Sequence, residues 1–155
     1  MLPEIRGNAL ELDLEIDPRG APMVELNVLR SPNEEEVTRI LLFKNRDITS
    51  RFILPQHKLG VVTLDGTRAS QLSDAWSRPP ETAAVRLDPD EPFRLRVFVD
   101  RSIVEVFVNG RQCLAIRVHP GRNDSLGVSL RAQGQDADLK SLTAWKMRSI
   151  YAQAR

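Results

Sequence analysis

Three acidic residues alternate with apolar ones near the start of the 155-residue chain, at a spacing that could support acid–base chemistry. Glu11, Asp13 and Glu15 occupy every second position, so on a β-strand all three would lie on one face. Two carboxyl groups that flank a glycosidic bond are the catalytic pair of most enzymes that cleave such bonds. These residues are therefore the first candidates for a catalytic site.

Strand geometry argues against that chemistry. Glu11 and Glu15 would lie about 13 Å apart at Cα on a regular strand, whereas a retaining pair holds its carboxyls about 5 Å apart. We favour the interpretation of a solvated acidic face on an edge strand, where charge discourages pairing with another chain. An active glycosidase that uses Glu11 and Glu15 is kept as the weaker alternative.

A second polar group, Asp100-Arg101-Ser102 with Glu105, interrupts an apolar stretch. Asp and Ser at a corner between strands can bond to neighbouring backbone N–H groups, and Arg101 can pair with a carboxylate. We favour this structural role. Contact of these residues with a sugar or with a partner domain is the alternative.

Trp76 and Cys113 are the remaining residues whose side chains could bind a ligand or a metal. Trp76 lies in a Ser-, Asp- and Pro-rich stretch and could stack on the C–H face of a sugar, but we favour a ring folded back onto the sheet. Cys113 is the only cysteine, so an internal disulfide and a thiolate metal site are excluded, and we expect it to be buried. No nucleophile motif and no histidine cluster is present, so we expect no catalytic residue, metal or cofactor.

The elements that position these residues follow a period of two, which is typical of half-buried strands. The runs expected as strands are Ala9–Asp17, Met23–Leu29, Val37–Phe43, Ile48–Leu54, Gly60–Leu64, Thr82–Leu87, Phe93–Val99, Ile103–Val108, Cys113–Val118, Leu126–Leu130 and Leu139–Lys146. The first two flank Asp17-Pro18-Arg19-Gly20, which suits a type I turn, and we interpret them as a hairpin. No helical period is sustained, so the sequence predicts an all-β, two-sheet antiparallel β-sandwich forming one domain over residues 1–155.

The strongest local pattern lies between Phe93 and Val118. Asn109-Gly110 can supply the two positive φ angles of a type I′ hairpin turn, so three strands should form a meander. Apolar residues on both parities of Ile103–Val108 predict a central strand covered on both faces. Trp145 shares its parity with Leu139 and Met147, which places it in the core by the same alternation.

Composition excludes several classes of partner. Twenty-two basic and 21 acidic residues leave a net charge of +1. A charge this small produces no long-range electrostatic field that would attract nucleic acid or anionic lipid. No apolar run is long enough to span a membrane, and the first residues lack the apolar core of a signal peptide. The compartment is left open, with the cytoplasm as the favoured expectation.

Beyond these patterns, the run LRVFVDRSIVEVFVNG (Leu95 to Gly110) resembles the signature of the C-terminal β-sandwich of glycoside hydrolase family 32, the invertases, inulinases, levanases and related β-fructosidases. LPEIRGNALELDLEID (Leu2 to Asp17) is similar to the opening of that module, and LTAWKMRSIY (Leu142 to Tyr151) to its closing strand. LDGTRAS (Leu64 to Ser70) is a looser match. The resemblance implies a concanavalin-like sandwich.

The resemblance also implies what the chain lacks. In the family, catalysis belongs to an N-terminal five-bladed propeller, and its Trp-Met-Asn-Asp-Pro-like, Arg-Asp-Pro and Glu-Cys motifs do not occur here. The expected function is that of a non-catalytic accessory domain of a β-fructosidase, which packs on the propeller or self-associates as a homodimer. A free-standing carbohydrate-binding module for fructan is the alternative, with Trp76, Asp100, Arg101, Ser102 and Glu105 as its possible sugar contacts.

Overall fold

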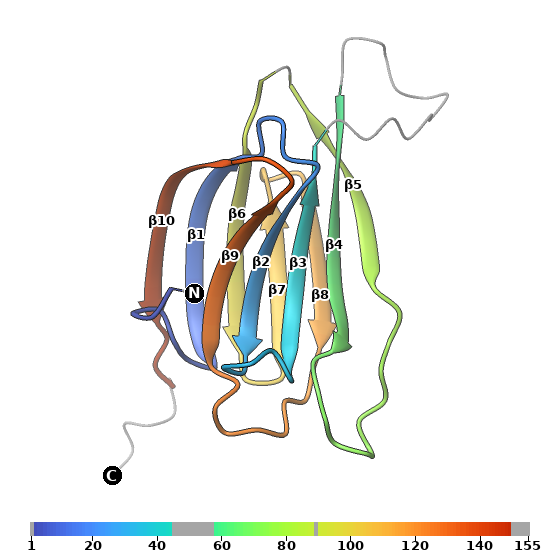
Figure 1. Cartoon of the computed structure of the whole chain (residues 1–155), viewed down its shortest axis with the longest axis vertical. Helices are drawn as coiled ribbons and strands as arrows, with labels where there is room; N and C mark the ends of the chain where they lie inside the picture. The colour runs from blue at the N-terminus through green and yellow to red at the C-terminus, as the bar shows by residue number, and fades with distance from the viewer. Residues whose placement is uncertain (1, 45–57, 89, 150–155) are drawn as a thin grey trace.

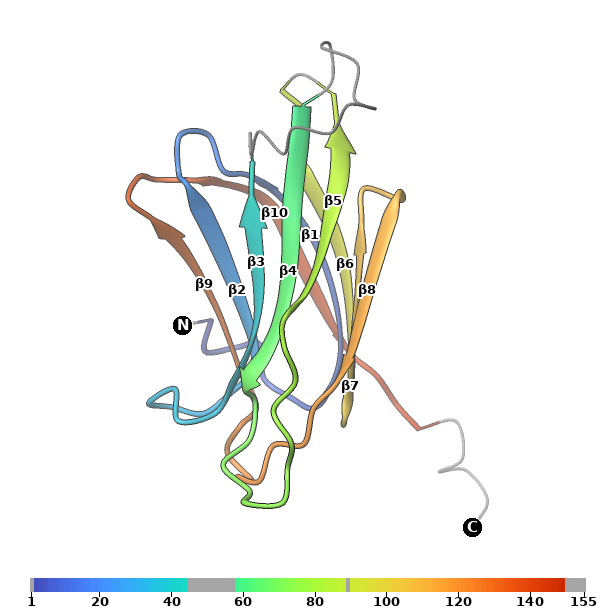
Figure 2. The same cartoon turned by 90° about the vertical axis from the view of Figure 1, so that its right-hand side faces the viewer.

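The computed structural model describes residues 2–44, 58–88 and 90–149, which form two facing five-stranded antiparallel sheets (Figures 1 and 2). Sheet I has the order β10 (Asp138–Lys146), β1 (Ala9–Asp17), β6 (Phe93–Asp100), β7 (Ile103–Val108) and β8 (Gln112–Arg117). Sheet II has the order β5 (Glu81–Leu87), β4 (Lys58–Arg68), β3 (Val37–Phe43), β2 (Met23–Arg30) and β9 (Gly127–Gln133). The described residues contain no helix, so the predicted all-β sandwich is confirmed.

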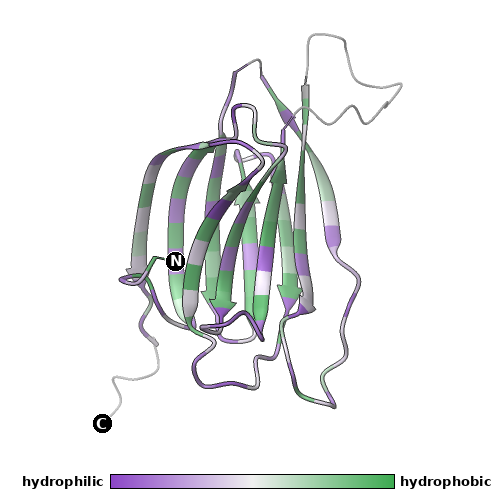
Figure 3. Cartoon of the chain, in the orientation of Figure 1, coloured by the Kyte–Doolittle hydropathy of each residue, from purple (hydrophilic) through white to green (hydrophobic). Residues whose placement is uncertain are grey.

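The core lies between the inner faces of the two sheets. Every second residue of β1 points inward and is buried, and the same alternation runs along β6 and β7. Figure 3 shows it as apolar and polar bands that alternate along the strands. The close fit of the layers is seen at Gly60, where an added Cβ would lie 2.7 Å from the ring of Phe93. Glycine therefore fits at position 60 without any shift of Phe93, whereas a larger residue would clash with its ring.

The first two strands do not form the hairpin predicted for them. β1 lies in sheet I between β10 and β6, whereas β2 lies in sheet II. The turn at Asp17 to Gly20 instead carries the chain from one sheet to the other, with Arg19 at a φ of 51° and a hydrogen bond from Ala21 N–H to Pro18 O. The prediction that the acidic face belongs to an edge strand is therefore also wrong. Alternation shows that a run is a strand but does not choose its neighbours.

Trp145 is not in the core. It lies opposite Glu11 on the outer face of sheet I and is 46% exposed, while Leu142 and Ala144 of the same strand face inward. The parity argument failed because the β1–β10 register shifts between Glu15 and Ile16. Leu139 lies opposite the inward-facing Ile16, so it no longer shares a face with Trp145.

The predicted meander β6–β7–β8 is confirmed, and Asn109 and Gly110 have the expected positive φ angles of 51° and 62°. However, only one face of β7 is covered. Ile103 and Phe107 are exposed on the outer face, and Cys113 on β8 is exposed as well, contrary to prediction. The expected strand Ile48–Leu54 lies outside the described residues.

The strand that is buried on both faces is β2. Its outer-face residues Glu25 and Asn27 are almost fully buried although they are polar. Arg131 donates to Glu25 at 2.8 Å, and the Asn27 amide donates to Glu25 at 2.8 Å and to the Ser129 hydroxyl at 3.1 Å. Hydrogen bonding therefore offsets part of the cost of burying these groups, while Asn27 Oδ1 is buried without a partner among the described residues.

These positions predict different responses to truncation of two aromatic residues. Phe93 is fully buried between the sheets, so Phe93→Ala should lower the free energy of unfolding by about 3–5 kcal/mol. Trp145→Ala removes a half-exposed ring and should cost less than half as much. Denaturant titration of both variants measures the two losses, and equal losses would contradict the placement of Trp145 outside the core.

Candidate functional site

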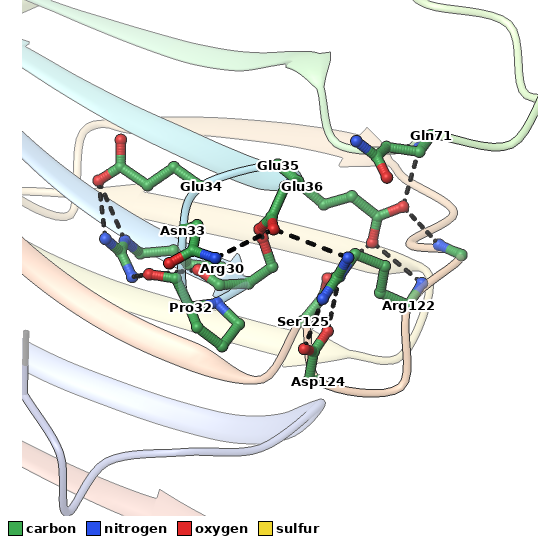
Figure 4. Close-up of polar contacts among 12 residues, drawn as sticks. Arg30, Pro32, Asn33, Glu34, Glu35, Glu36, Gln71, Arg122, Asp124 and Ser125 are labelled. Carbon is green, nitrogen blue, oxygen red and sulfur yellow. Dashed lines mark hydrogen bonds and ion pairs between the residues drawn. The ribbon is translucent and has the colours of Figure 1, made fainter.

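A buried carboxylate organises one end of the sandwich. Glu36, which comes directly before β3, is fully buried and accepts four hydrogen bonds (Figure 4). The donors are the Ser125 hydroxyl at 2.6 Å and the backbone N–H groups of Gln71 at 2.8 Å, Gly121 at 2.8 Å and Arg122 at 3.1 Å. Each oxygen of the carboxylate receives two of these bonds, so its acceptor capacity is well used.

Two opposing effects act on the pKa of Glu36. Burial alone raises the pKa because it penalises the charged form, but hydrogen bonds from Ser125 and the three backbone N–H groups lower it more. The pKa therefore lies below its ordinary value of 4.5, and the carboxylate is ionised at neutral pH.

Glu36 joins three connections, which we call the loop end: residues 31–36 between β2 and β3, 69–80 between β4 and β5, and 118–126 between β8 and β9. The first connection is also closed internally. Ser31 and Glu36 exchange two hydrogen bonds, from Ser31 N–H to Glu36 O at 2.9 Å and from Glu36 N–H to the Ser31 hydroxyl at 3.0 Å. One side chain thus holds segments from three separate parts of the sequence.

Ion pairs surround this buried group. Arg122 binds Asp124 through two hydrogen bonds of 2.8 and 2.7 Å and lies 3.7 Å from Glu35. The Ser31 hydroxyl, with the N–H of Glu35 itself and the Asn33 amide, lowers the pKa of Glu35 to about 2. The charges at the loop end are therefore largely compensated within the chain.

A depression of about 520 Å³ opens at the loop end. Its polar lining includes Asn8, Arg101, Ser102, His119 and Asn123, and its apolar lining includes Leu29, Leu72, Val118 and Leu126. We call it the loop-end depression. It is an open concave surface that is lined by hydrogen-bonding and apolar groups in similar measure.

Of the predicted polar group, two residues line the depression and two do not. Arg101 has a φ of 54°, and its N–H donates to Asn8 O at 2.6 Å, while Ser102 O accepts from Val118 N–H at 2.8 Å. Asp100 ends β6, and Glu105 lies in the middle of β7. Backbone hydrogen bonds hold this corner, and the side chains of Arg101 and Ser102 have no hydrogen-bond or ion-pair partner among the described residues.

Trp76 lies in the connection 69–80 and is 95% exposed, so the expectation of a ring folded back onto the sheet is wrong. It lines a groove that shares Val118 and His119 with the loop-end depression. The hydrogen bond from Gln71 N–H to Glu36 holds the start of its connection, but nothing covers the indole itself.

Glu11, Asp13 and Glu15 of β1, which we call the acidic row, lie on the outer face of sheet I and do not line the loop-end depression. Arg96 Nε donates to Glu11 at 2.7 Å, and Arg94 Nε donates to Glu15 at 3.2 Å. Asp13 lies between them and is exposed. Each glutamate is thus bound to a different arginine on the neighbouring strand β6.

The same outer face carries exposed apolar residues on the meander. We call Phe98, Ile103, Phe107, Cys113 and Ala115 the meander patch. The rings of Phe98 and Phe107 meet edge to face with centroids 5.9 Å apart, and Phe107 lies opposite Cys113 in the register. These residues come from three adjacent strands and surround Glu105, which lies opposite Phe98 and Ala115 in the register.

Glu36 was not recognised as important from the sequence. It is the last of three consecutive glutamates, and such a run normally belongs to a solvated surface. Its four donors come from positions 71 to 125, which no local pattern connects to it.

Within residues 2–44, 58–88 and 90–149, no group of three or more His, Cys, Asp or Glu residues could hold a metal ion. That part of the chain also has no helix long and apolar enough to cross a membrane.

Comparison with known sequences identifies close similarity to one family. Residues 2–146 match the model described as Glycosyl hydrolases family 32 C terminal. The chain is 31% identical over 131 residues to the insoluble beta-fructofuranosidase isoenzyme CWINV1 of Arabidopsis thaliana, covering 80% of this chain and 21% of that protein. It is 45% identical over 78 residues to a raffinose invertase of Escherichia coli, covering 46% of this chain and 16% of that protein. The chain thus spans about a fifth of the length of these relatives.

Solved structures share the fold. Fructan 1-exohydrolase IIa from Cichorium intybus matches with a TM-score of 0.70 and 19% identity, covering 91% of this chain and 31% of that chain. A fructosyltransferase from A. japonicus matches with a TM-score of 0.73 and 17% identity, covering 96% and 24%. Sheep galectin-11 matches with a TM-score of 0.55 and 13% identity, covering 90% and 91%.

The Glu36 network predicts a large loss of stability on a conservative substitution. Glu36→Gln keeps the size of the side chain but places an amide NH₂ against buried donors, so the free energy of unfolding at pH 7 should fall by about 2–4 kcal/mol. Ser125→Ala removes one donor of four and should cost about 1 kcal/mol. Denaturant titration measures both losses.

The same network predicts a dependence on pH. Because the folded-state pKa of Glu36 is lowered, its contribution is fully present above the ordinary value of 4.5 and is lost as the pH falls through the folded-state pKa. The stability gap between wild type and Glu36→Gln should therefore narrow below pH 4.5. If the difference in free energy of unfolding between the two proteins stays constant down to pH 2, the charge of the Glu36 carboxylate does not contribute to stability.

Proposed function

The chain belongs to the C-terminal domain family of glycosyl hydrolases family 32, and from this premise we propose that it is a non-catalytic accessory domain that packs against the propeller-type catalytic domain of a β-fructosidase. The relatives that it matches are about five times longer than the matched region, so most of their length lies in other parts of the molecule. A domain in this position needs one surface for a neighbour. A catalytic centre of its own is not required.

The observation that carries this proposal is the meander patch on the outer face of sheet I. Phe107 is 41% exposed, and Ile103 is exposed to a similar extent. Elsewhere on this face, the long side chains of β1 and β6 are bound to one another as ion pairs. Exposed apolar residues gathered in one place mark a surface that another protein surface covers.

The state of the acidic row also supports an accessory role. Glycosidase chemistry needs one carboxyl group that can donate a proton and a second that can attack or activate water. Here Glu11 and Glu15 are each bound to an arginine of the neighbouring strand, Arg96 and Arg94. That arrangement supports a structural role for the two glutamates, as ion pairs that link β1 to β6.

Two assays test the absence of catalysis. Purified protein should release no fructose from sucrose, inulin or levan, as measured by reducing-sugar assay. Incubation with β-glucans tests the alternative use of the acidic row. Hydrolysis that disappears in Glu11→Gln or Glu15→Gln would show that the row is catalytic and would refute the accessory role.

The docking surface predicts a concentration-dependent assembly. When the meander patch is not covered by a catalytic domain, two copies should bury it against each other around a two-fold axis, since this is the simplest closed arrangement. Sedimentation velocity at several concentrations should show the dimer. Phe107→Lys should abolish it without changing the folded state.

Trp145→Lys is the matched control. Trp145 is 46% exposed, close to the 41% of Phe107, and lies on the same outer face of sheet I but on β10, outside the meander patch. This variant should dimerise like the wild type. A wild-type protein that stays monomeric at all concentrations, or a dimer lost equally in both variants, would contradict the assignment of the patch.

A further inference from the structure

We propose that the loop-end depression, together with the groove lined by Trp76, binds a neutral oligosaccharide. This inference does not rest on the accessory function, because it concerns a different surface. The meander patch lies on the outer face of sheet I, whereas Trp76 and the depression lie among the connections at the loop end.

The first observation is the state of Trp76. Its indole is 95% exposed, which leaves almost all of a large apolar ring in contact with solvent. Its connection is held by the bond from Gln71 N–H to Glu36 and by Ala75 N–H donating to Leu72 O. A ring that is presented in this way, and packs against nothing, offers a flat apolar platform to a ligand.

The second observation is the chemistry of the loop-end depression. Arg101, Asn8 and Asn123 supply guanidinium and amide groups to its lining, and Val118 and Leu126 supply apolar groups. The guanidinium of Arg101 has five N–H donors, none of them bonded to a described residue. The volume of about 520 Å³ falls in the range of small-molecule sites, about 300–1,000 Å³.

The third observation is rigidity. Glu36 fixes both Gln71, near Trp76, and the segment Gly121 to Ser125, which borders the depression. Arg101, which also lines the depression, has a positive φ, and its backbone N–H donates to Asn8 O. A site whose walls are already ordered loses little conformational entropy when a ligand binds.

These features together favour a neutral oligosaccharide. A sugar ring has an apolar C–H face that can stack on Trp76 and hydroxyl groups that can accept from Arg101 and the amides. Arg122, which also lines the depression, is already paired with Asp124 and Glu35, so Arg101 is the guanidinium left to bind the ligand. The groove and the depression share Val118 and His119, so a ligand bound in the depression lies beside the groove that Trp76 lines.

The two tryptophans of the chain make a direct test possible. Trp145→Phe leaves Trp76 as the single indole, and its fluorescence should shift and saturate as an inulin-type fructo-oligosaccharide is added. Cello- and malto-oligosaccharides are the second and third probes, and their effect on the fluorescence is compared with that of the fructo-oligosaccharide. Trp76→Phe, which keeps only the distant Trp145, should show no fluorescence response to any of them.

Affinity measurements separate this site from nonspecific binding. In calorimetry or ¹⁵N chemical-shift titration, Trp76→Ala and Arg101→Ala should each weaken binding roughly tenfold, while Leu139→Ala should leave it unchanged. Unaltered thermal unfolding of the Trp76 and Arg101 variants shows that they fold. Absence of saturable binding to all three sugars, or binding that survives both substitutions, would overturn the proposal.

Discussion

The structure depends on the burial of one face of each sheet against the other. Apolar side chains at every second position of β1, β6 and β7 meet those of β2, β3 and β4, and this contact excludes water from a continuous core. All other features are arranged around it. The outer faces need only be compatible with solvent or with a neighbour, so they can differ between the sheets: sheet II buries a hydrogen-bonded polar network around Glu25 and Asn27, and sheet I exposes the meander patch.

The apolar core does not by itself order the loop end, and Glu36 has that role. A carboxylate with four donors can organise backbone that belongs to no sheet, because each bond ties an N–H or hydroxyl group of one connection to the same buried side chain. The cost of removing the charge from water is offset only while all partners are in place. Order in the three connections is therefore cooperative.

The consequence for function is a separation of two surfaces. The meander patch is apolar, lies on regular strands and suits the flat surface of another domain. The loop end is concave, mixes polar with apolar groups and suits a small ligand. The two surfaces adjoin at the β6–β7 corner, where Ile103 of the patch follows Ser102 of the depression, so under our proposals a docked catalytic domain would lie beside the loop end.

Local pattern determined the ten strands that the structure describes, the Asn109-Gly110 turn, the meander and the all-β class, because alternation and turn chemistry act between residues close in the chain. The run from Leu95 to Gly110 also carried the resemblance to the family. Tertiary structure alone decided that β1 and β2 lie in different sheets, that a register shift turns Trp145 outward, and that the outer face of β7 is open. It also decided that Glu36 is buried and that Trp76 is exposed to solvent. These outcomes depend on which segments distant in sequence come together, and period-two alternation is the same whichever strand lies alongside.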